Sequence, residues 1–284
     1  MQQQIEQAAA RFAGVIGVAA KNLLSGEEVV VNSDTPFPTA STIKTAVMVE
    51  AYHQAAEGKL PLGARIRLRE SDKVGGSGVL NGMAEGLELK VLDLIHLMIT
   101  LSDNTATNML VTRLGAKQID DRLTHYGLRQ TKIFRPTFRD GRPDVFPELE
   151  REFGLGMTTP REMAKLMALI AEGRAVSTEA SAKMLATLRC QQDRAMIPRF
   201  LPQDGSIDVG NKTGTDSEKL PDASGRRGAI RADAAIVTGP GVKYVIAIYT
   251  RRGADPRYGI DNAALIEGAR ISQKVFEGFA RRGK

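Results

Sequence analysis

The chain has 284 residues, of which 42% are hydrophobic and 25% charged, and its formal net charge at pH 7 is +6. This composition excludes fibrous and disordered classes and is typical of one large globular domain or two closely packed ones. The basic residues are scattered rather than clustered, which argues against nucleic-acid binding. No apolar run approaches the roughly 18 residues of a membrane span. We therefore expect neither nucleic acid nor membrane as a partner, and we expect a monomer.

Cysteine content and the first residues bear on the cellular compartment. Cys190 is the single cysteine, so an internal disulfide and a cysteine zinc cluster are both excluded. The opening stretch "MQQQIEQAAARFAG" lacks the basic and apolar regions of a signal peptide. Two readings stay open: the protein is cytoplasmic, or the chain is a trimmed mature form.

The predicted elements, in chain order, indicate a sheet built from both ends of the chain. Residues 2–13 have the pattern of an amphipathic helix, and residues 15–22 and 27–31 that of a hairpin. The pattern from 41 to about 200 is chiefly helical. Strands return at 206–215, 231–239 and 243–251, and a last helix covers about 261–280. Strands from the two ends most simply pair with each other.

We therefore predict an α+β fold. An antiparallel sheet of N- and C-terminal strands is flanked by the terminal helices, and the central helices form a second lobe. The corresponding boundaries are 1–38 with 202–284 for the discontinuous sheet domain and 39–201 for the helical domain. A cleft between two such lobes is where an active site is expected.

Local signals mark the helix ends within the helical region. The helix that follows residue 44 ends at Gly58, a good residue for the left-handed C-terminal position. In "TTPREMAKLMALIAEG" Thr159 is a natural N-cap, Pro160 occupies the first helical position and Glu162 completes a capping box. Ser102-Asp103-Asn104 interrupts two further helices.

The stretch "FPTASTIK" places Ser41 and Lys44 three residues apart at the start of a helix that is apolar on nearly all sides. A charged lysine in the first turn of a buried helix must be paired, neutralised or useful. One helical turn brings both side chains to the same face. Because an unactivated serine is a poor nucleophile and needs a base beside it, Lys44 is a candidate base for Ser41.

Three short motifs occur together: S-x-x-K at 41–44, Ser-Asp-Asn at 102–104 and Lys-Thr-Gly at 212–214. Each alone is a weak signal, but their order and spacing, with "TTPREMA" and "RADAAIV", resemble the superfamily of serine β-lactamases and penicillin-binding proteins, and most of all the class A β-lactamases. The resemblance covers nearly the whole chain. It implies a β-lactamase/transpeptidase-like fold and a serine hydrolase that needs no cofactor.

Residue roles follow from this resemblance and from the side chains themselves. Ser41 is the nucleophile and Lys44 its base, and Ser102 relays a proton to the departing nitrogen. Asn104 offers its amide to the carbonyl of the substrate side chain. The backbone N–H groups of Ser41 and Thr215 form the oxyanion hole.

The substrate carboxylate has its own predicted partners. Lys212 and Thr213 present a charge and a hydroxyl, and Gly214 allows close backbone approach. Arg231 matches the position at which many relatives place a second carboxylate-binding cation; its alternative is a surface arginine. His53, His96 and His125 lack metal-ligand spacing, so we predict no metal site.

The chain departs from the family where the deacylating base is expected. Relatives place a glutamate before the proline of an E-P-E-L-N motif, whereas this sequence reads "FPELER" with Phe146 at that position. Glu150 lies one helical turn along and is a candidate replacement. Glu148 is its rival, and a third possibility is that Glu148, Glu150 and Glu152 only solvate a loop. No arginine–aspartate pair that would clasp the loop is found.

The sequence thus favours a serine β-lactamase that hydrolyses the β-lactam amide bond through a Ser41 acyl-enzyme. The alternatives are a penicillin-binding peptidase or esterase, or a covalent β-lactam sensor, with slow or absent deacylation. The expected partner is a small β-lactam or an acyl-peptide. The resemblance implies a periplasmic or secreted protein. The Gly-rich stretch 72–80 and the polar stretch 216–228 are predicted to border the cleft as loops.

Overall fold

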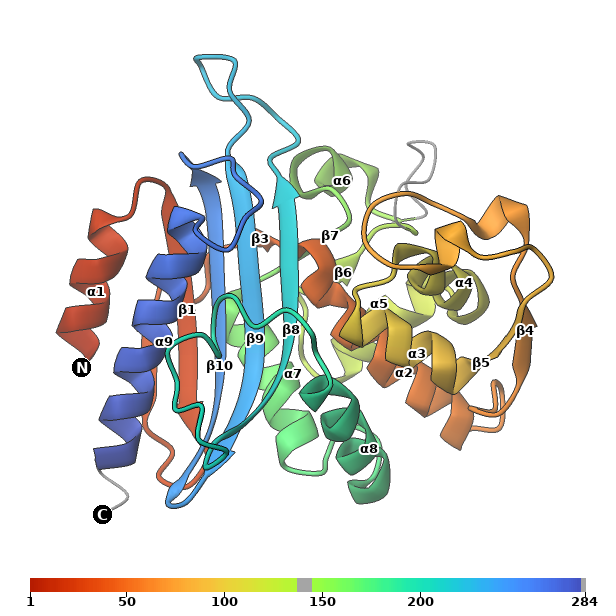
Figure 1. The fold of residues 1–284 in the computed structure, drawn as a ribbon, viewed down its shortest axis with the longest axis horizontal. Helices are drawn as coiled ribbons and strands as arrows, with labels where there is room; N and C mark the ends of the chain where they lie inside the picture. Colours follow the sequence, from red (N-terminus) through yellow and green to blue (C-terminus); the bar gives the residue numbers. More distant parts are fainter. Residues whose placement is uncertain (137–144, 282–284) are drawn as a thin grey trace.

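The molecule is built around a five-stranded antiparallel sheet (Figure 1). The structure is a computed structural model that describes residues 1–136 and 145–281. The strand order is β2-β1-β10-β9-β8, which pairs strands from the two ends of the chain. The predicted α+β fold is therefore confirmed. The strands are β1 (Val15–Asn22), β2 (Glu28–Val31), β8 (Asp208–Ser217), β9 (Ala229–Gly239) and β10 (Val242–Gly253).

Helices cover both faces of this sheet (Figure 1). Helices α1 (Gln2–Arg11) and α9 (Ala263–Arg281) pack on one face, and α7 (Pro160–Ala171) packs on the other. Alternate residues of β1 serve the two cores: Val18 belongs to the core beneath α1 and α9, and Ala19 to the core shared with α7. This alternation follows from the two-residue period of a strand.

The remaining helices gather beside the β8 edge of the sheet (Figure 1). They surround the buried helix α2, ten of whose residues are buried, as its nearly all-apolar pattern predicts. Short strands form two small sheets, β3-β7-β6 and β4-β5. The elements are α2 (Lys44–Ala56), α3 (Val91–Thr100), α4 (Asn104–Leu114), α5 (Ala116–His125), α6 (Pro147–Phe153), α8 (Thr178–Arg189), β3 (Phe37–Pro38), β4 (Arg65–Arg67), β5 (Glu88–Lys90), β6 (Lys132–Ile133) and β7 (Gly156–Thr158).

Most predicted helix ends are confirmed, but the capping box at α7 is wrong. Thr159 caps α7 by accepting a hydrogen bond from the Glu162 N–H at 3.2 Å, and Pro160 is the first helical residue. The Glu162 carboxylate instead accepts hydrogen bonds from the Gln130 N–H and the Thr131 hydroxyl. The Glu162 side chain therefore bonds to a segment about thirty positions away and not to the N-terminus of its own helix.

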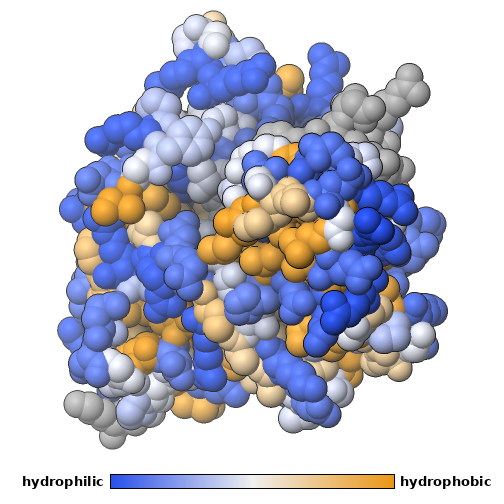
Figure 2. All heavy atoms as spheres, turned by 45° about the vertical axis from the view of Figure 1, so that its right-hand side comes forward, coloured by the Kyte–Doolittle hydropathy of each residue, from blue (hydrophilic) through white to orange (hydrophobic). Residues whose placement is uncertain are grey.

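The surface carries an apolar patch near the middle of the face in Figure 2, bordered by polar side chains. Several large apolar residues of the region from 79 to 101 are at least 37% exposed, namely Val79, Met83, Leu87, Leu92 and Leu101. Within the described part of the chain, no helix is long and apolar enough to cross a membrane.

Candidate active site

Ser41 lies in a short 3₁₀ helix, η1 (Ala40–Ile43), that leads directly into α2 and packs against strand β8. A Cβ atom at Gly214 of β8 would lie 3.2 Å from the Ser41 nitrogen and 2.9 Å from the Thr39 carbonyl oxygen. Only glycine therefore allows this approach. Ala40, just before the serine, has a φ of 43°, a sparsely populated conformation for a residue with a side chain.

The Lys44 amine joins the second motif to the first. Its Nζ lies 2.7 Å from the Ser102 carbonyl oxygen, 2.7 Å from Asn104 Oδ1 and 3.2 Å from Ser102 Oγ. A neutral amine has two N–H donors, which the first two acceptors satisfy, and a lone pair that remains available. Ser102 itself has a φ of 55°, so left-handed backbone geometry recurs at the site.

Burial lowers the pKa of both site lysines, and a neighbouring cation adds to this effect at Lys44. Lys44 is fully buried, and this desolvation, with the positive charge of Lys212, lowers its pKa well below 10.5. Desolvation also lowers the pKa of Lys212, to about 8, although Asp193 and Asp233 act in the opposite direction. Lys212 Nζ lies 3.1 Å from Ser102 Oγ, so the hydroxyl stands between two amines.

Asn104 and Asp103 fasten the Gly-rich stretch to α4. The Asn104 side-chain amide donates to the Gly75 carbonyl oxygen, and its backbone N–H donates to that of Ser77, both at 3.0 Å. Asp103 Oδ2 accepts from the backbone N–H groups of Val79 and Leu80, while Oδ1 caps α4 through Ala106. The wall beside the cleft is therefore tied to the residues that touch Lys44.

Strand β8 forms the edge of the sheet and turns backbone groups toward the cleft. Thr215 lies opposite Arg231 in β9, whose backbone N–H donates to, and whose carbonyl oxygen accepts from, the Thr250 side-chain hydroxyl of β10 on its other side. In an antiparallel ladder such a pair is not hydrogen-bonded, so the Thr215 N–H points outward from the sheet. The Thr213 carbonyl points the same way and accepts from Lys212 Nζ at 2.8 Å.

A cavity of about 360 Å³ opens at this edge and includes the two serines of the first two motifs. Its lining includes a segment that no sequence motif marks, so it could not be selected from the sequence. That segment follows α8 and contributes Gln191, Gln192 and Asp193. The described residues that line the cavity are Ser41, Ser77, Thr100, Leu101, Ser102, Gln191, Gln192, Asp193, Thr213 and Thr215.

Arg231 is fully buried rather than a surface residue. Its guanidinium donates to the carbonyl oxygens of Asp216, Ile230 and Arg257 and lies 4.9 Å from the Tyr258 ring centroid. Nη1 reaches two of these oxygens and Nη2 reaches one, so in this conformation the guanidinium braces the end of β8.

Phe146 and Glu150 lie at the start of α6. Phe146 has a φ of 53°, and its ring packs edge-on against Phe134. Glu150 Oε1 receives two contacts from Arg135, 3.0 Å from Nε and 2.9 Å from Nη2. This arginine–glutamate pair joins α6 to the segment that follows β6. Glu148 is exposed, and Glu152 contacts Arg251 at 3.2 Å.

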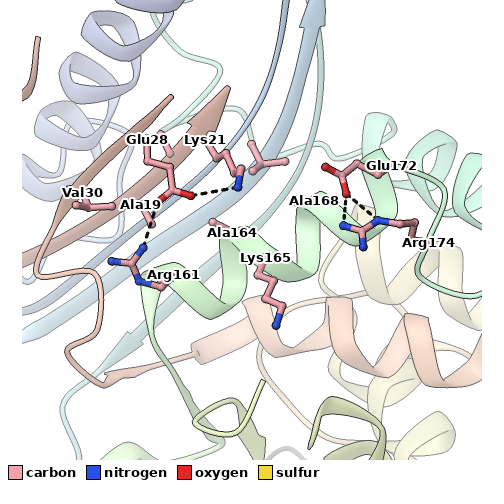
Figure 3. Close-up of a pocket in the computed structure, with 12 residues that line it drawn as sticks. Ala19, Lys21, Glu28, Val30, Arg161, Ala164, Lys165, Ala168, Glu172 and Arg174 are labelled. Atoms are coloured by element: carbon pink, nitrogen blue, oxygen red, sulfur yellow. Dashed lines mark hydrogen bonds and ion pairs between the residues drawn. The ribbon is translucent and has the colours of Figure 1, made fainter. Parts of the chain in front are cut away.

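A second cavity, of about 300 Å³, lies between α7 and strands β1 and β2 (Figure 3). Its floor is built from small side chains that include Ala19, Ala164 and Ala168. Ion pairs of Glu28 and of Glu172 stand at its two ends, and Lys165 points away from the floor (Figure 3). None of the described residues that line it is a serine, threonine or cysteine. Across the described residues, no group of three or more His, Cys, Asp or Glu side chains is placed to hold a metal ion.

Comparison with known proteins agrees with this geometry. A family model described as the β-lactamase enzyme family matches residues 1–279. The β-lactamase CARB-3 of Pseudomonas aeruginosa is 25% identical over 180 residues. That match covers 62% of this chain, and the chain spans 59% of the length of CARB-3.

Two solved structures match over nearly the full length. The β-lactamase of Sphaerobacter thermophilus superposes with a TM-score of 0.81 at 31% identity and covers 98% of this chain and 97% of its own. PBP-A superposes with a TM-score of 0.82 at 28% identity and covers 99% of this chain and 96% of its own. The family match, the sheet built from both chain ends and the meeting of three motifs at one cavity agree: the chain belongs to the β-lactamase enzyme family.

Proposed function

We propose that this protein is a serine β-lactamase that opens the β-lactam amide bond through an acyl-enzyme on Ser41. The observation that carries the proposal is the contact of buried Lys44 with both Ser102 and Asn104 beside the cavity that contains Ser41. A lysine with a strongly lowered pKa is a plausible base at neutral pH, which an ordinary surface lysine is not.

In the proposed reaction Lys44 takes the proton of the Ser41 hydroxyl as Oγ attacks the lactam carbonyl carbon. The N–H groups of Ser41 and Thr215 stabilise the oxyanion, and collapse of the tetrahedral intermediate breaks the C–N bond. Ser102, which lies between Lys44 and Lys212, passes a proton to the departing nitrogen. Lys212 and Thr213 hold the substrate carboxylate. We expect a monomer to suffice, working outside the cytoplasm.

The test is intact-protein mass spectrometry over time after mixing with benzylpenicillin, with hydrolysis followed in parallel. A transient adduct with sustained turnover is the expected result. An adduct that persists in stoichiometric amount supports the second candidate below. No adduct and no turnover would overturn the proposal.

The second candidate is a penicillin-binding peptidase or esterase that becomes acylated but releases the acyl group slowly. The observation in its favour is Phe146, an apolar residue where the family motif has a glutamate. PBP-A, one of the structural matches, has been solved as a variant in an acyl-enzyme complex with penicillin G. A covalent sensor would share this behaviour and differ only in lacking turnover of any substrate.

Replacement of Glu150 by glutamine tests our proposed deacylating base. Both contacts from Arg135 go to Oε1, which leaves Oε2 for a water molecule. We expect Glu150→Gln to slow acyl-enzyme hydrolysis by about 10²–10⁴-fold, the usual contribution of a general base, without slowing acylation. Glu152→Gln is the matched control, and Glu148→Gln tests the rival base. If turnover is unchanged in Glu150→Gln, its role is confined to clasping Arg135.

The charge of Lys212 should give acylation an alkaline limit. Because the pKa of Lys212 is lowered to about 8 and the acid form carries the charge, the lysine becomes neutral as the pH rises through 8. We expect acylation by benzylpenicillin to weaken above that pH. Lys212→Arg, which stays charged, should move the limit upward. Lys212→Ala should lose carboxylate-bearing substrates more than neutral esters, and an equal loss would contradict a carboxylate-binding role.

A further inference from the structure

Among the described residues that line the cavity beside Ser41, Asp193 is the one that carries a charge. It is exposed, it lines the cavity together with Thr213 and Thr215 of β8, and its carbonyl oxygen bonds to Asn211 of the same strand. A carboxylate is unexpected there, because the proposed ligand of Lys212 and Thr213 is itself a carboxylate, and like charges repel.

The backbone of Asp193 is held firmly on both sides. Its N–H donates to Gln191 Oε1 at 3.0 Å, and its carbonyl oxygen accepts from Asn211 Nδ2 at 3.3 Å. Gln191 is anchored in turn to the Ile99 carbonyl oxygen, and Asn211 to the fully buried Asp233. The backbone position of Asp193 is therefore fixed by hydrogen bonds to buried neighbours.

No cation in the described structure neutralises Asp193. Oδ1 accepts a hydrogen bond from the Ala195 N–H, and no salt bridge to either oxygen is formed by the described residues. The neighbouring Arg194 turns away and donates to the Val209 carbonyl oxygen. Arg231 is engaged by backbone carbonyls, as described above. The charge of Asp193 acts to raise the pKa of Lys212, but the Lys212 amine donates its hydrogen bonds to the Thr213 carbonyl oxygen and the Ser102 hydroxyl.

We propose that Asp193 makes the leaving-group end of the cleft a subsite for a cationic nitrogen, so that the preferred substrate is zwitterionic there. The carboxylate of such a substrate meets Lys212 and Thr213, and its positive group meets Asp193. The inference rests on the proposed function, because the roles of Ser102 and Lys212 define which half of the substrate leaves. It names a charge preference that neither the three motifs nor the family match assigns.

Two cephalosporins with the same thienylacetyl side chain provide the test. Cephaloridine carries a pyridinium group on its leaving half, and cephalothin carries a neutral acetoxy group at the same position. The quantity to measure is the second-order rate constant for acylation of Ser41, taken as the ratio of cephaloridine to cephalothin. We expect this ratio to fall about three- to tenfold in Asp193→Asn, the size of one partly screened charge interaction. Raised ionic strength should shrink the wild-type ratio.

The matched control is Glu88→Gln, which removes one exposed negative charge from β5 and should leave the ratio unchanged. Asp193→Ser, which keeps an oxygen for the Ala195 N–H, serves as a second variant if Asp193→Asn folds poorly. An unchanged ratio in the Asp193 variants, while benzylpenicillin still acylates Ser41, overturns the subsite alone. Failure of all three lactams to acylate the wild-type protein overturns the proposed function, and the subsite with it.

Discussion

Replacement of Ser41 by alanine should abolish covalent labelling by benzylpenicillin. The hydroxyl is the proposed nucleophile, and no acyl-enzyme can form without it. Intact-protein mass spectrometry should show only the unmodified mass, whereas the wild-type protein gains the mass of one penicillin. The variant should fold normally, because Ser41 lines the cavity and loss of its hydroxyl leaves the close approach of its backbone to Gly214 intact.

Ser77→Ala is the matched control, because Ser77 lines the same cavity and its carbonyl contact with Asn104 does not require the hydroxyl. This variant should still be labelled. An adduct that remains in Ser41→Ala would assign the nucleophile to another residue, and peptide mapping of the adduct would identify it.

Replacement of Lys44 should have the second largest effect. It should slow acylation without changing the number of labels that each protein molecule finally carries. Lys44→Met keeps most of the buried volume but removes the amine, and we expect acylation to slow by about 10²–10⁴-fold. Lys44→Arg retains a positive charge and donors for the Ser102 and Asn104 oxygens, yet a guanidinium does not deprotonate at neutral pH. It should therefore fail as well. Stopped-flow acylation measures both variants.

A structural role for Lys44 would give a different pattern. Because its amine joins Ser102 to Asn104, loss of these contacts alone would lower the melting temperature, and Lys44→Arg would recover a large part of the activity. Circular dichroism of both variants separates the two cases. Slow acylation in a stably folded Lys44→Arg protein supports the base.

The sequence predicts the fold well, because its strands and helix ends carry local signals, and it marks the candidate site residues by short motifs. The strands predicted at 15–22, 231–239 and 243–251 follow from apolar runs and turns, and they match β1, β9 and β10 to within two residues at each end. Ser102-Asp103-Asn104 is recognisable as a break between helices. Tens of residues separate these motifs in the chain. That they meet at one site is predicted only by the resemblance to a family in which they occur in the same order.

Other parts of the site could not be predicted, because they depend on contacts between distant segments. Asp193 follows α8 without any motif, and only the packing of that segment beside β8 reveals that it lines the cavity. Glu162 has the right spacing for a capping box, but a neighbouring loop supplies better donors. Arg135 and Glu150 pair across 15 positions, of which residues 137–144 lie outside the described structure.

The strand order β2-β1-β10-β9-β8 also has a consequence for how the protein acquires its structure. Val15 pairs with Arg251, so β1, near the start of the chain, cannot pair with β10 until nearly the whole chain has been synthesised. Contacts between residues so far apart in sequence slow folding, because the loop between them must close first. During synthesis β1 and β2 can form only an isolated hairpin, which is at best marginally stable. A chain that stops before β10 would leave β1 with an open edge, which is a template for aggregation.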